Sequence, residues 1–348
     1  MSSLIKVGVV VPSNRPEMKE KWLSEWQNEL WGEDNGFESS LYWISDDEET
    51  WEDIKRDLGK MAWIIPVRSD CIRSYGFLQA YRDGCQVTIT LDDDVFPGVS
   101  VIKTHVDWVN RPLYALGWQP TLRGRNCPPT RGLPLWRTVG INHGLWTGIP
   151  DVSAETQLKG YRNDYEQADR DNDFIVPYGH YYPMSGMNVA FDTRLTSWMY
   201  FTLQGWDIRE PYESRWGMDR AGDIIAGVIS KTLIDASTRF GVHSGEPYVH
   251  HIRASDPVKN HVLESFGSDY PGLLSHVIRG STTLGEISNR LFNWDNKKFK
   301  KYNRNLSEAL RIWHDLTRPS NFASSRSVPE PKNETASHKR LAKSEIVP

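Results

Sequence analysis

The 348-residue chain lacks several features that mark large protein classes. Its three cysteines, Cys71, Cys85 and Cys127, are too few and too scattered for a zinc cage or a disulfide framework. No stretch approaches the roughly 18 consecutive apolar residues of a membrane-spanning helix, and residues 1–4 show no basic and apolar signal sequence. The net charge of −4 argues against nucleic acid as the main partner. These absences predict a cytoplasmic protein with reduced thiols that binds neither membranes nor nucleic acids.

Two common nucleotide-binding motifs are missing as well. No G-x-G-x-x-G segment follows an expected strand, and no G-K-[ST] P-loop occurs anywhere in the chain. The chain therefore carries no dinucleotide or flavin fingerprint. A nucleotide bound here would be held by a metal ion, arginines and backbone groups.

The most informative segment that is present joins an apolar strand to three acids. Val87 to Leu91 are β-branched or aliphatic, which predicts a buried strand, and Asp92, Asp93 and Asp94 follow it directly. Three carboxylates at one strand end repel one another unless a cation neutralises them. Oxygen-rich sites suit hard cations such as Mg²⁺, Ca²⁺ and Mn²⁺, and a cation there could hold a diphosphate. The alternative is a solvated acidic turn that caps the next helix.

Strands and helices alternate through the first hundred residues. The expected strands lie at 5–11, 41–44, 62–67 and 87–91, and the expected helices at 16–31, 51–58 and 71–81. This order predicts an α/β fold with a doubly wound, mostly parallel sheet. In such sheets ligands bind beyond the carboxyl ends of the strands. Ser13, Arg15, Arg68 and the aspartates at 92–94 all follow expected strands and should share that edge.

The rest of the chain is less regular. The middle, 110–180, is rich in proline and glycine and is expected to be loop-rich, whereas 188–191 reads as a strand and 221–235, 286–294 and 305–316 read as helices. From 317 to 348 serine, proline, lysine and glutamate dominate, which predicts a disordered tail. We therefore expect one domain at 1–316. That this domain is catalytic, with a nucleotide-binding half at 1–110 and a sugar or acceptor half at 111–316, is implied by the family resemblance given below.

Three further groups of residues could carry chemistry. His250 and His251 follow an expected strand at 245–249, so one imidazole could join the aspartates as a metal ligand. The alternative is that both are ordinary surface residues. Arg137 offers a planar fork for phosphate, or is a surface arginine. Gly186 would allow a ligand to approach and Asn188 could bind a sugar hydroxyl, or the segment is a tight turn.

Four sequence blocks in a fixed order carry a resemblance to a known family. The blocks are Val10–Pro12, Cys71–Phe77 with Thr90–Asp94, His143–Trp146 with 149–151 and 156–158, and Pro183–Asn188 with 190–192, extended by 247–251. Over about residues 5–270 the chain resembles the reversibly glycosylated polypeptide family, glycosyltransferase family 75, which includes flavin-free UDP-arabinopyranose mutases. The resemblance implies a GT-A-like, Rossmann-type nucleotide-sugar-binding domain, a bound Mn²⁺ or Mg²⁺, no flavin, and a GDP- or UDP-linked sugar as substrate.

The resemblance also implies roles for individual residues. The metal ligands would be Asp92, Asp94 and His251, with His251 favoured over His250, and the catalytic residues Arg137, Asp219 and His143. The nucleotide or sugar would contact Pro12, Ser13, Arg15, Arg68, Arg73, Asp92, Asp93, Trp146, Ser185, Gly186 and Asn188. Arg137 falls on the arginine that family members glycosylate, as nucleophile or as diphosphate clamp, although its spacer to His143 is shorter here.

A second departure affects the expected activity. Where plant members have an Asp-Asp-Met-Trp-Ala-Gly run, this chain reads Gly-Met-Asp-Arg-Ala-Gly at 217–222, so the base has moved to Asp219 or the sugar contacts differ. Some bacterial relatives use GDP-sugars, and this chain resembles that branch. The leading hypothesis is an NDP-sugar pyranose–furanose mutase with self-glycosylation on an arginine. The alternatives are an inverting or retaining glycosyltransferase with an external acceptor and a non-catalytic NDP-sugar-binding protein. The sequence leaves a homo-oligomer open.

Overall fold

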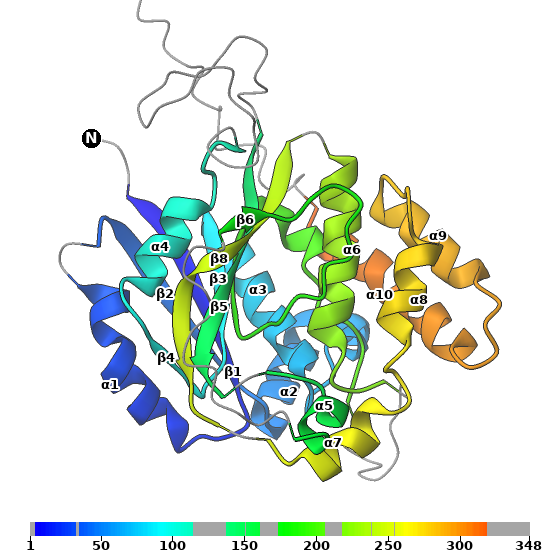
Figure 1. Ribbon diagram of the computed structural model, residues 1–348, viewed down its shortest axis with the longest axis horizontal. Coiled ribbons are helices and arrows are strands. Elements are labelled where there is room, and N and C mark those ends of the chain that lie inside the picture. Colours follow the sequence, from blue (N-terminus) through cyan, green and yellow to red (C-terminus); the bar gives the residue numbers. More distant parts are fainter. Residues whose placement is uncertain are drawn as a thin grey trace, which may run out of the picture. The chain divides into compact units, whose positions relative to one another are not determined.

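One eight-stranded sheet forms the centre of the computed structural model (Figure 1). The structure describes residues 4–32, 35–113, 137–149, 151–160, 173–205, 218–237, 239–253 and 255–318. The strands are β1 Ile5–Ser13, β2 Phe37–Ser45, β3 Val87–Leu91, β4 Val95–Pro97, β5 Thr138–Gly148, β6 Phe174–Ile175, β7 Asn188–Asp192 and β8 Phe240–His251. Their spatial order is β2-β1-β3-β7-β5-β8-β4, and β6 pairs with β8.

The sheet is parallel in its first part and mixed in the rest. Strands β2, β1 and β3 run parallel, as the alternating strands and helices predict, so the α/β class is confirmed. Strand β7 is antiparallel to both β3 and β5, and β4 is antiparallel to β8, so the expectation of a mostly parallel sheet is corrected. The reason is where β7 begins. Asn188 pairs with Leu91, so the chain enters β7 at the carboxyl end of β3 and must run back.

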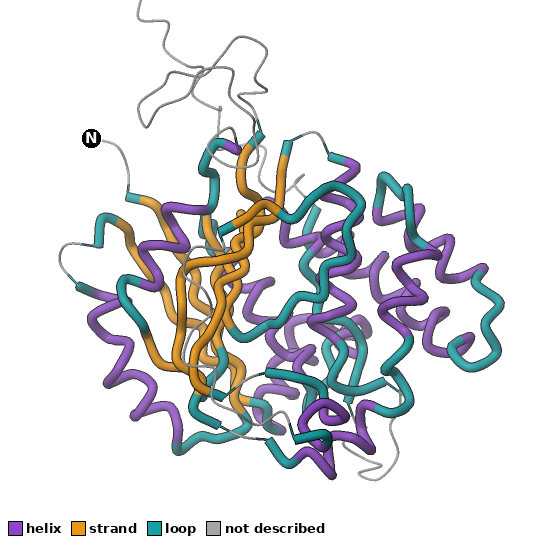
Figure 2. The backbone as a smooth tube through the Cα atoms, in the orientation of Figure 1, coloured by secondary structure: helices purple, strands orange, loops and turns teal. Residues whose placement is uncertain are grey.

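Helices cover both faces of the sheet (Figure 2). They are α1 Met18–Trp31, α2 Glu48–Leu58, α3 Arg73–Arg82, α4 Val101–Trp108, α5 Ala154–Leu158, α6 Gly222–Ala236, α7 Pro257–Glu264, α8 Tyr270–Val277, α9 Leu284–Asn293 and α10 Lys300–Leu316. The period-two alternation of β1 separates two cores. Val9 joins the core that contains Trp22 of α1, whereas Val10 joins the core that contains Phe77 of α3. None of the described helices is long and apolar enough to cross a membrane.

Two expectations about local structure were wrong. Residues 62–67 are not a strand, because the 3₁₀ helix η1 spans Gly59–Ile64 and buries Ile64 in the core. An apolar run that is buried on all sides has the same sequence pattern whether it forms a strand or a helix. Here the Ile64 carbonyl accepts a hydrogen bond from the Tyr200 hydroxyl instead of pairing with another strand. Conversely, β5 lies inside the region expected to be loop-rich.

The described residues cover only part of the domain prediction. Residues 1–317 form one compact unit, in which Trp313 of α10 donates from Nε1 to the Thr196 carbonyl at 2.9 Å. The division into a nucleotide-binding and a sugar half stays a prediction. Nearly all of the expected disordered tail, 317–348, lies outside the described residues, as does the whole segment 114–136 with Cys127.

Candidate active site

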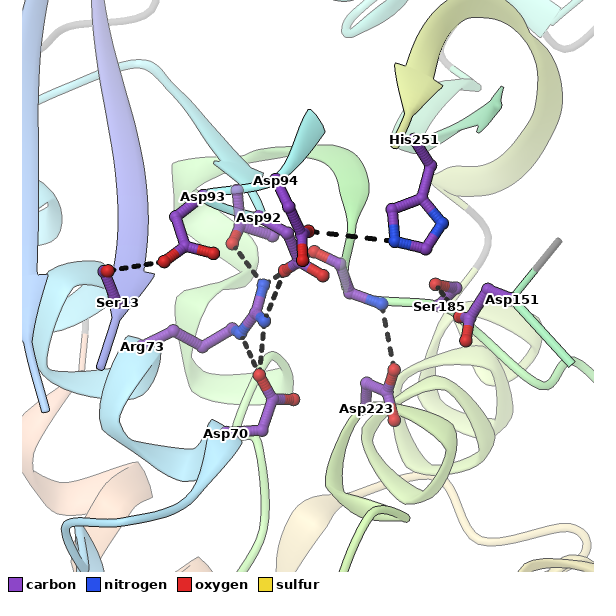
Figure 3. Close-up of polar contacts among 12 residues, drawn as sticks. Ser13, Asp70, Arg73, Asp92, Asp93, Asp94, Asp151, Ser185, Asp223 and His251 are labelled. Carbon is purple, nitrogen blue, oxygen red and sulfur yellow. Dashed lines mark hydrogen bonds and ion pairs between the residues drawn. The ribbon is translucent and has the colours of Figure 1, made fainter. Parts of the chain in front are cut away.

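The carboxyl ends of several strands meet around the three aspartates (Figure 3). Asp92–Asp94 connect β3 to β4, and Val95 of β4 pairs with His251 at the end of β8. The register of β5 against β8 brings Gly148 opposite the same histidine. Sequence reasoning therefore placed the acids, the loop after β1 and the second histidine correctly at one edge of the sheet.

The loop after β1 holds the aspartate turn in place. The Ser13 hydroxyl donates to Asp93 Oδ2 at 2.5 Å and the Arg15 guanidinium donates from Nε to the same oxygen at 3.1 Å. Arg15 Nη2 also lies 2.9 Å from Asp94 Oδ2. Burial, followed by the charge of Asp92, raises the pKa of Asp94 above its ordinary value, although Arg15 and His251 oppose this. Arg15 thus contacts both Asp93 and Asp94 and balances their two negative charges only in part.

His251, and not His250, faces this turn. Nδ1 of His251 lies 2.7 Å from the Ile149 carbonyl and must donate to it, so Nε2 is the ring nitrogen that a cation could bind in the neutral form. That Nε2 lies 3.8 Å from Asp94 Oδ1. His250 is exposed, because successive strand residues point to opposite faces, and its Nδ1 lies 3.2 Å from the Thr147 hydroxyl. A backbone hydrogen bond that orients the other ring nitrogen is typical of metal-binding histidines.

The expected set of three protein ligands does not assemble. Among the described residues no three His, Cys, Asp or Glu side chains lie close enough together to hold a metal ion. Asp92 Oδ1 is instead 2.8 Å from Arg73 Nη2, so that carboxylate already has a cationic partner. The pair that fits a hard cation is Asp94 with His251, and further ligands would have to come from bound diphosphate or water.

Arg73, at the start of α3, lies in the interior and connects three segments of the chain. It donates to Asp70 from Nε (2.6 Å), to Thr90 Oγ1 (2.8 Å) and the Gly186 carbonyl (2.7 Å) from Nη1, and to Asp92 from Nη2, which also forms an ion pair with Asp70. Burial alone would lower the pKa of the guanidinium, but the Asp70 and Asp92 carboxylates raise it above its ordinary value. Arg73 was predicted to bind nucleotide. In the structure all three of its side-chain nitrogens contact protein groups, and it positions Asp92.

Gly186 occupies a point where no side chain fits. Its N–H donates to Asp223 Oδ2 at 3.0 Å while its carbonyl accepts from Arg73. A Cβ at this position would lie 2.6 Å from the Phe201 ring and 3.1 Å from Arg73 Nη1. The expectation that this glycine permits close approach is right, but the groups that approach are protein side chains.

Gly186→Ala is expected to destabilise the protein by about 1–3 kcal/mol, because the added methyl overpacks a filled interior. Gly272→Ala is the matched control, since Gly272 lies in α8 with no heavy atom within 4 Å of its added Cβ. Urea unfolding of both variants measures the difference. Equal urea midpoints for the two variants would show that the interior around Gly186 accommodates the added methyl group without loss of stability.

Three acids of this site were not selected from the sequence. Asp70 pairs with Arg73, Asp151 accepts from the Ser185 hydroxyl at 2.9 Å, and Asp223 accepts from Gly186. Burial, then the charges of Asp70 and Asp151, raise the pKa of Asp223 to about 7. Asp151 and Asp70 lie inside or beside the sequence blocks, which was an available signal. Asp223 had none except its place at the start of a helix.

Several predicted sugar contacts turn out to be interior contacts. Asn188 uses its whole amide, because Oδ1 lies 2.8 Å from His105 Nε2 and Nδ2 donates to the Leu145 and Pro247 carbonyls. The proposed hydroxyl contact of Asn188 is therefore corrected. His143 Nε2 accepts from the Ser185 N–H at 3.3 Å, and burial lowers the pKa of the imidazole to about 4, so it is neutral at pH 7.

The remaining predicted residues border the site without a decisive contact. Trp146 is half-buried on β5 with its ring edge toward His143, at 6.3 Å between centroids. Pro12 lies in β1 opposite Ile44. Arg68 is exposed, and its backbone N–H donates to the Asp46 carboxylate.

The sequence also matches a known protein family and known proteins. The sequence model of the family described as reversibly glycosylated polypeptide matches residues 34–272. The chain belongs to this family. The family predicted from the four sequence blocks is thus confirmed, whereas the bacterial branch stays a prediction.

Two similar proteins are both named as UDP-arabinopyranose mutases. "Probable UDP-arabinopyranose mutase 4" of Arabidopsis thaliana is 30% identical over 290 residues, which is 75% of this chain and 74% of that protein. "UDP-arabinopyranose mutase 1" of Oryza sativa subsp. japonica is 30% identical over 243 residues, 65% of this chain and 60% of that protein. The chain thus spans less than two thirds of the length of the rice relative.

Two solved structures align over most of the chain at low identity. S. aureus TarS 1-349 is 14% identical with a TM-score of 0.34, covering 93% of this chain and 76% of that one. Mannosyltransferase PcManGT from Pyrobaculum calidifontis, in complex with GDP-Man and Mn²⁺, is 13% identical with a TM-score of 0.36, covering 94% and 78%. At TM-scores this low neither superposition bears on the ligands of this family member.

Two family-derived assignments do not fit the geometry. Arg137 precedes β5, whose 11 residues at about 3.3 Å each place it roughly 36 Å from the end that carries the site. There its Nη2 donates to the Phe240 carbonyl at 3.2 Å. Asp219 accepts from the Arg220 N–H, whereas the acid that reaches the site is Asp223. The sequence matched the order of the family's blocks but could not show which end of a strand each residue occupies.

Arg137→Gln is therefore expected to leave turnover of a nucleotide sugar within about threefold of wild type. The residue lies too far from the aspartate turn to act as nucleophile or clamp. Steady-state kinetics and mass spectrometry of the protein after incubation with labelled sugar nucleotide measure this. A complete loss of activity, or label on Arg137, would contradict the position that the structure gives it.

Proposed function

We propose that this chain is a metal-dependent, flavin-free pyranose–furanose mutase that acts on a GDP- or UDP-linked sugar. Family membership and the relatives' names support an intramolecular transferase. The single observation that carries the proposal is the position of His251 Nε2, which lies 3.8 Å from Asp94 Oδ1 at the carboxyl edge of the sheet while Nδ1 contacts the Ile149 carbonyl. Such an edge is where α/β folds bind ligands.

The charges around Asp94 suit a diphosphate. Arg15 Nη2 and Arg253 Nη1 lie 2.9 and 3.9 Å from Asp94 Oδ2. A divalent cation between Asp94 and His251 would neutralise the diphosphate and stabilise it as a leaving group. The two guanidiniums could then turn from the carboxylate to phosphate oxygens, for which their planar forks are well shaped. Arg73 would keep Asp92 in position throughout, because its three side-chain nitrogens already contact protein groups.

The sugar would lie between the aspartate turn and the acids on the opposite side (Figure 3). Asp151, Ser185 and Asp223 come from three separate segments and approach the same space. Carboxylate and hydroxyl oxygens are suitable partners for sugar hydroxyls. We extend the proposal to reversible self-glycosylation on an arginine at this edge, where Arg15 and Arg253 replace Arg137 as the arginines near the site.

The test is incubation of the purified protein with Mn²⁺ and a panel of UDP- and GDP-sugars, followed by chromatography and NMR of the products. We expect one sugar nucleotide to equilibrate between its pyranose and furanose forms, and chelation of the metal to stop this. The proposal fails if no furanose forms from any member of the panel. Nucleotide release only after an acceptor is added would indicate a glycosyltransferase, and tight binding without turnover a binding protein.

A further inference from the structure

The ring interconversion has a proton requirement that the aspartate turn does not meet. This inference rests on the proposed function. A pyranose ring closes through O5 and a furanose ring through O4, so O4 loses a proton and O5 gains one. A group that accepts the first proton and returns it to the second oxygen leaves the protein unchanged after each turnover. Such a group must lie on the sugar side of the site and must not already be fully paired.

Most acids and bases of the site are already committed. Asp92 pairs with Arg73, and Asp93 accepts from both Ser13 and Arg15. Asp94 faces His251 in the place proposed for the cation. His143 accepts the Ser185 N–H through Nε2. None of these can both take up and release a proton without disturbing the fold or the cation site.

Asp223 differs from them in its position and partners. It stands at the start of α6, and among the described residues its two oxygens accept only from backbone N–H groups, those of Gly186 at 3.0 Å and Ile224 at 2.8 Å. In Figure 3 its carboxylate points up toward Ser185, across from the aspartate turn. A carboxyl oxygen with one N–H partner retains a second lone pair for a ligand.

The charges that face Asp223 come from three segments. Asp70 lies in the 3₁₀ helix η2 (Asp70–Ile72), Asp151 follows β5, and Arg73 begins α3. Burial and the two carboxylates raise the pKa of Asp223 to about 7, while the Gly186 N–H and Arg73 oppose them. Both protonation states are therefore accessible at neutral pH, as a group that alternates between them requires.

We propose that Asp223 is a catalytic residue that carries the proton from O4 to O5 of the sugar. The C1–O bond to the diphosphate breaks first, and its electron pair leaves with the diphosphate. O4 then attacks C1 while its proton passes to Asp223. The C1–O5 bond breaks next, its electron pair stays on O5, and O5 takes the proton from Asp223. The diphosphate oxygen finally attacks C1 again, which restores the nucleotide sugar in its furanose form.

The test compares two reactions of Asp223→Asn. Scrambling of ¹⁸O from the bridging to the non-bridging phosphate position reports C1–O cleavage alone, whereas furanose formation needs the proton relay as well. We expect the variant to scramble ¹⁸O within about threefold of wild type and to form furanose at least roughly 100-fold more slowly. Asp235→Asn is the matched control, because Asp235 lies at the other end of α6 and pairs with Lys231. It should retain both reactions.

The pH profile gives a second readout. The relay begins with ionised Asp223, so the rate of furanose formation by wild type should fall as the pH drops through about 7. The rate of ¹⁸O scrambling should not show this acid limb of the pH profile. Asp223→Glu, which keeps the carboxyl group, should shift the limb. The inference is overturned if Asp223→Asn forms furanose at a near wild-type rate, if both reactions fall equally, or if the glutamate variant leaves the limb unmoved. If wild type performs neither reaction, the proposed function itself fails.

Discussion

Arg73→Lys is expected to destabilise the protein by about 3–5 kcal/mol and to lower turnover at least roughly 100-fold. Lysine keeps the positive charge, but its three donors on one atom cannot reproduce the hydrogen bonds that connect Asp70, Thr90, Asp92 and Gly186. Some of these groups would lose their hydrogen-bond partner in the interior, and a buried polar group left unsatisfied is costly. Asp92 would also lose the contact that fixes its orientation.

Urea unfolding and titration with a nucleoside diphosphate separate the two effects. The matched control is Arg82→Lys, because Arg82 ends the same helix and forms an exposed ion pair with Asp57. Exposed pairs contribute little, so this control should change neither stability nor turnover appreciably. If Arg73→Lys unfolded at the same urea concentration as the control, the interior network would have no energetic role.

His251→Gln is expected to weaken Mn²⁺ binding in the presence of nucleoside diphosphate by at least about 100-fold, and turnover should fall with it. The imidazole Nε2 is one of only two protein groups, with Asp94, that the described structure offers to a cation here. Glutamine has no ring nitrogen to present once the contact to the Ile149 carbonyl is gone. Asp94→Asn should give the same result by removing the second ligand.

His250→Gln is the control for this experiment. It changes the adjacent residue of β8 in the same way, but that side chain is exposed on the opposite face of the strand. Free Mn²⁺ measured by electron paramagnetic resonance gives the affinities directly. Equal affinities for the two histidine variants would place the cation elsewhere and remove the basis of the proposed leaving-group stabilisation.

What the sequence could predict depends on how local the determining contacts are. The apolar run Val87–Leu91 ending in three acids specifies a strand and its polar end without help from the rest of the chain, and β3 has these bounds. The family blocks likewise depend only on order along the chain. The roles of Arg73 and Asn188 depend instead on partners far away in sequence, and these turned predicted ligand contacts into interior ones.

Strand β5 shows the same limit for secondary structure. Its sequence contains glycines and the polar residues Asn142 and His143, a composition typical of a loop. The strand exists because distant side chains satisfy those polar groups inside the fold. Asn142 Nδ2 lies 2.9 Å from His105 Nδ1, and Asn142 Oδ1 lies 2.5 Å from His243 Nδ1. Without knowledge of the three-dimensional partners, no periodicity could have indicated it.

The backbone of Gly186 limits how this protein could evolve. Its carbonyl accepts from Arg73 and its N–H donates to Asp223, so both contacts depend on the two peptide planes that meet at this residue. A change of sugar preference cannot be achieved at this position without disturbing the cation edge. Divergence toward new substrates is therefore expected to accumulate at Asp151 and Ser185, whose side chains form the contact between them at the site.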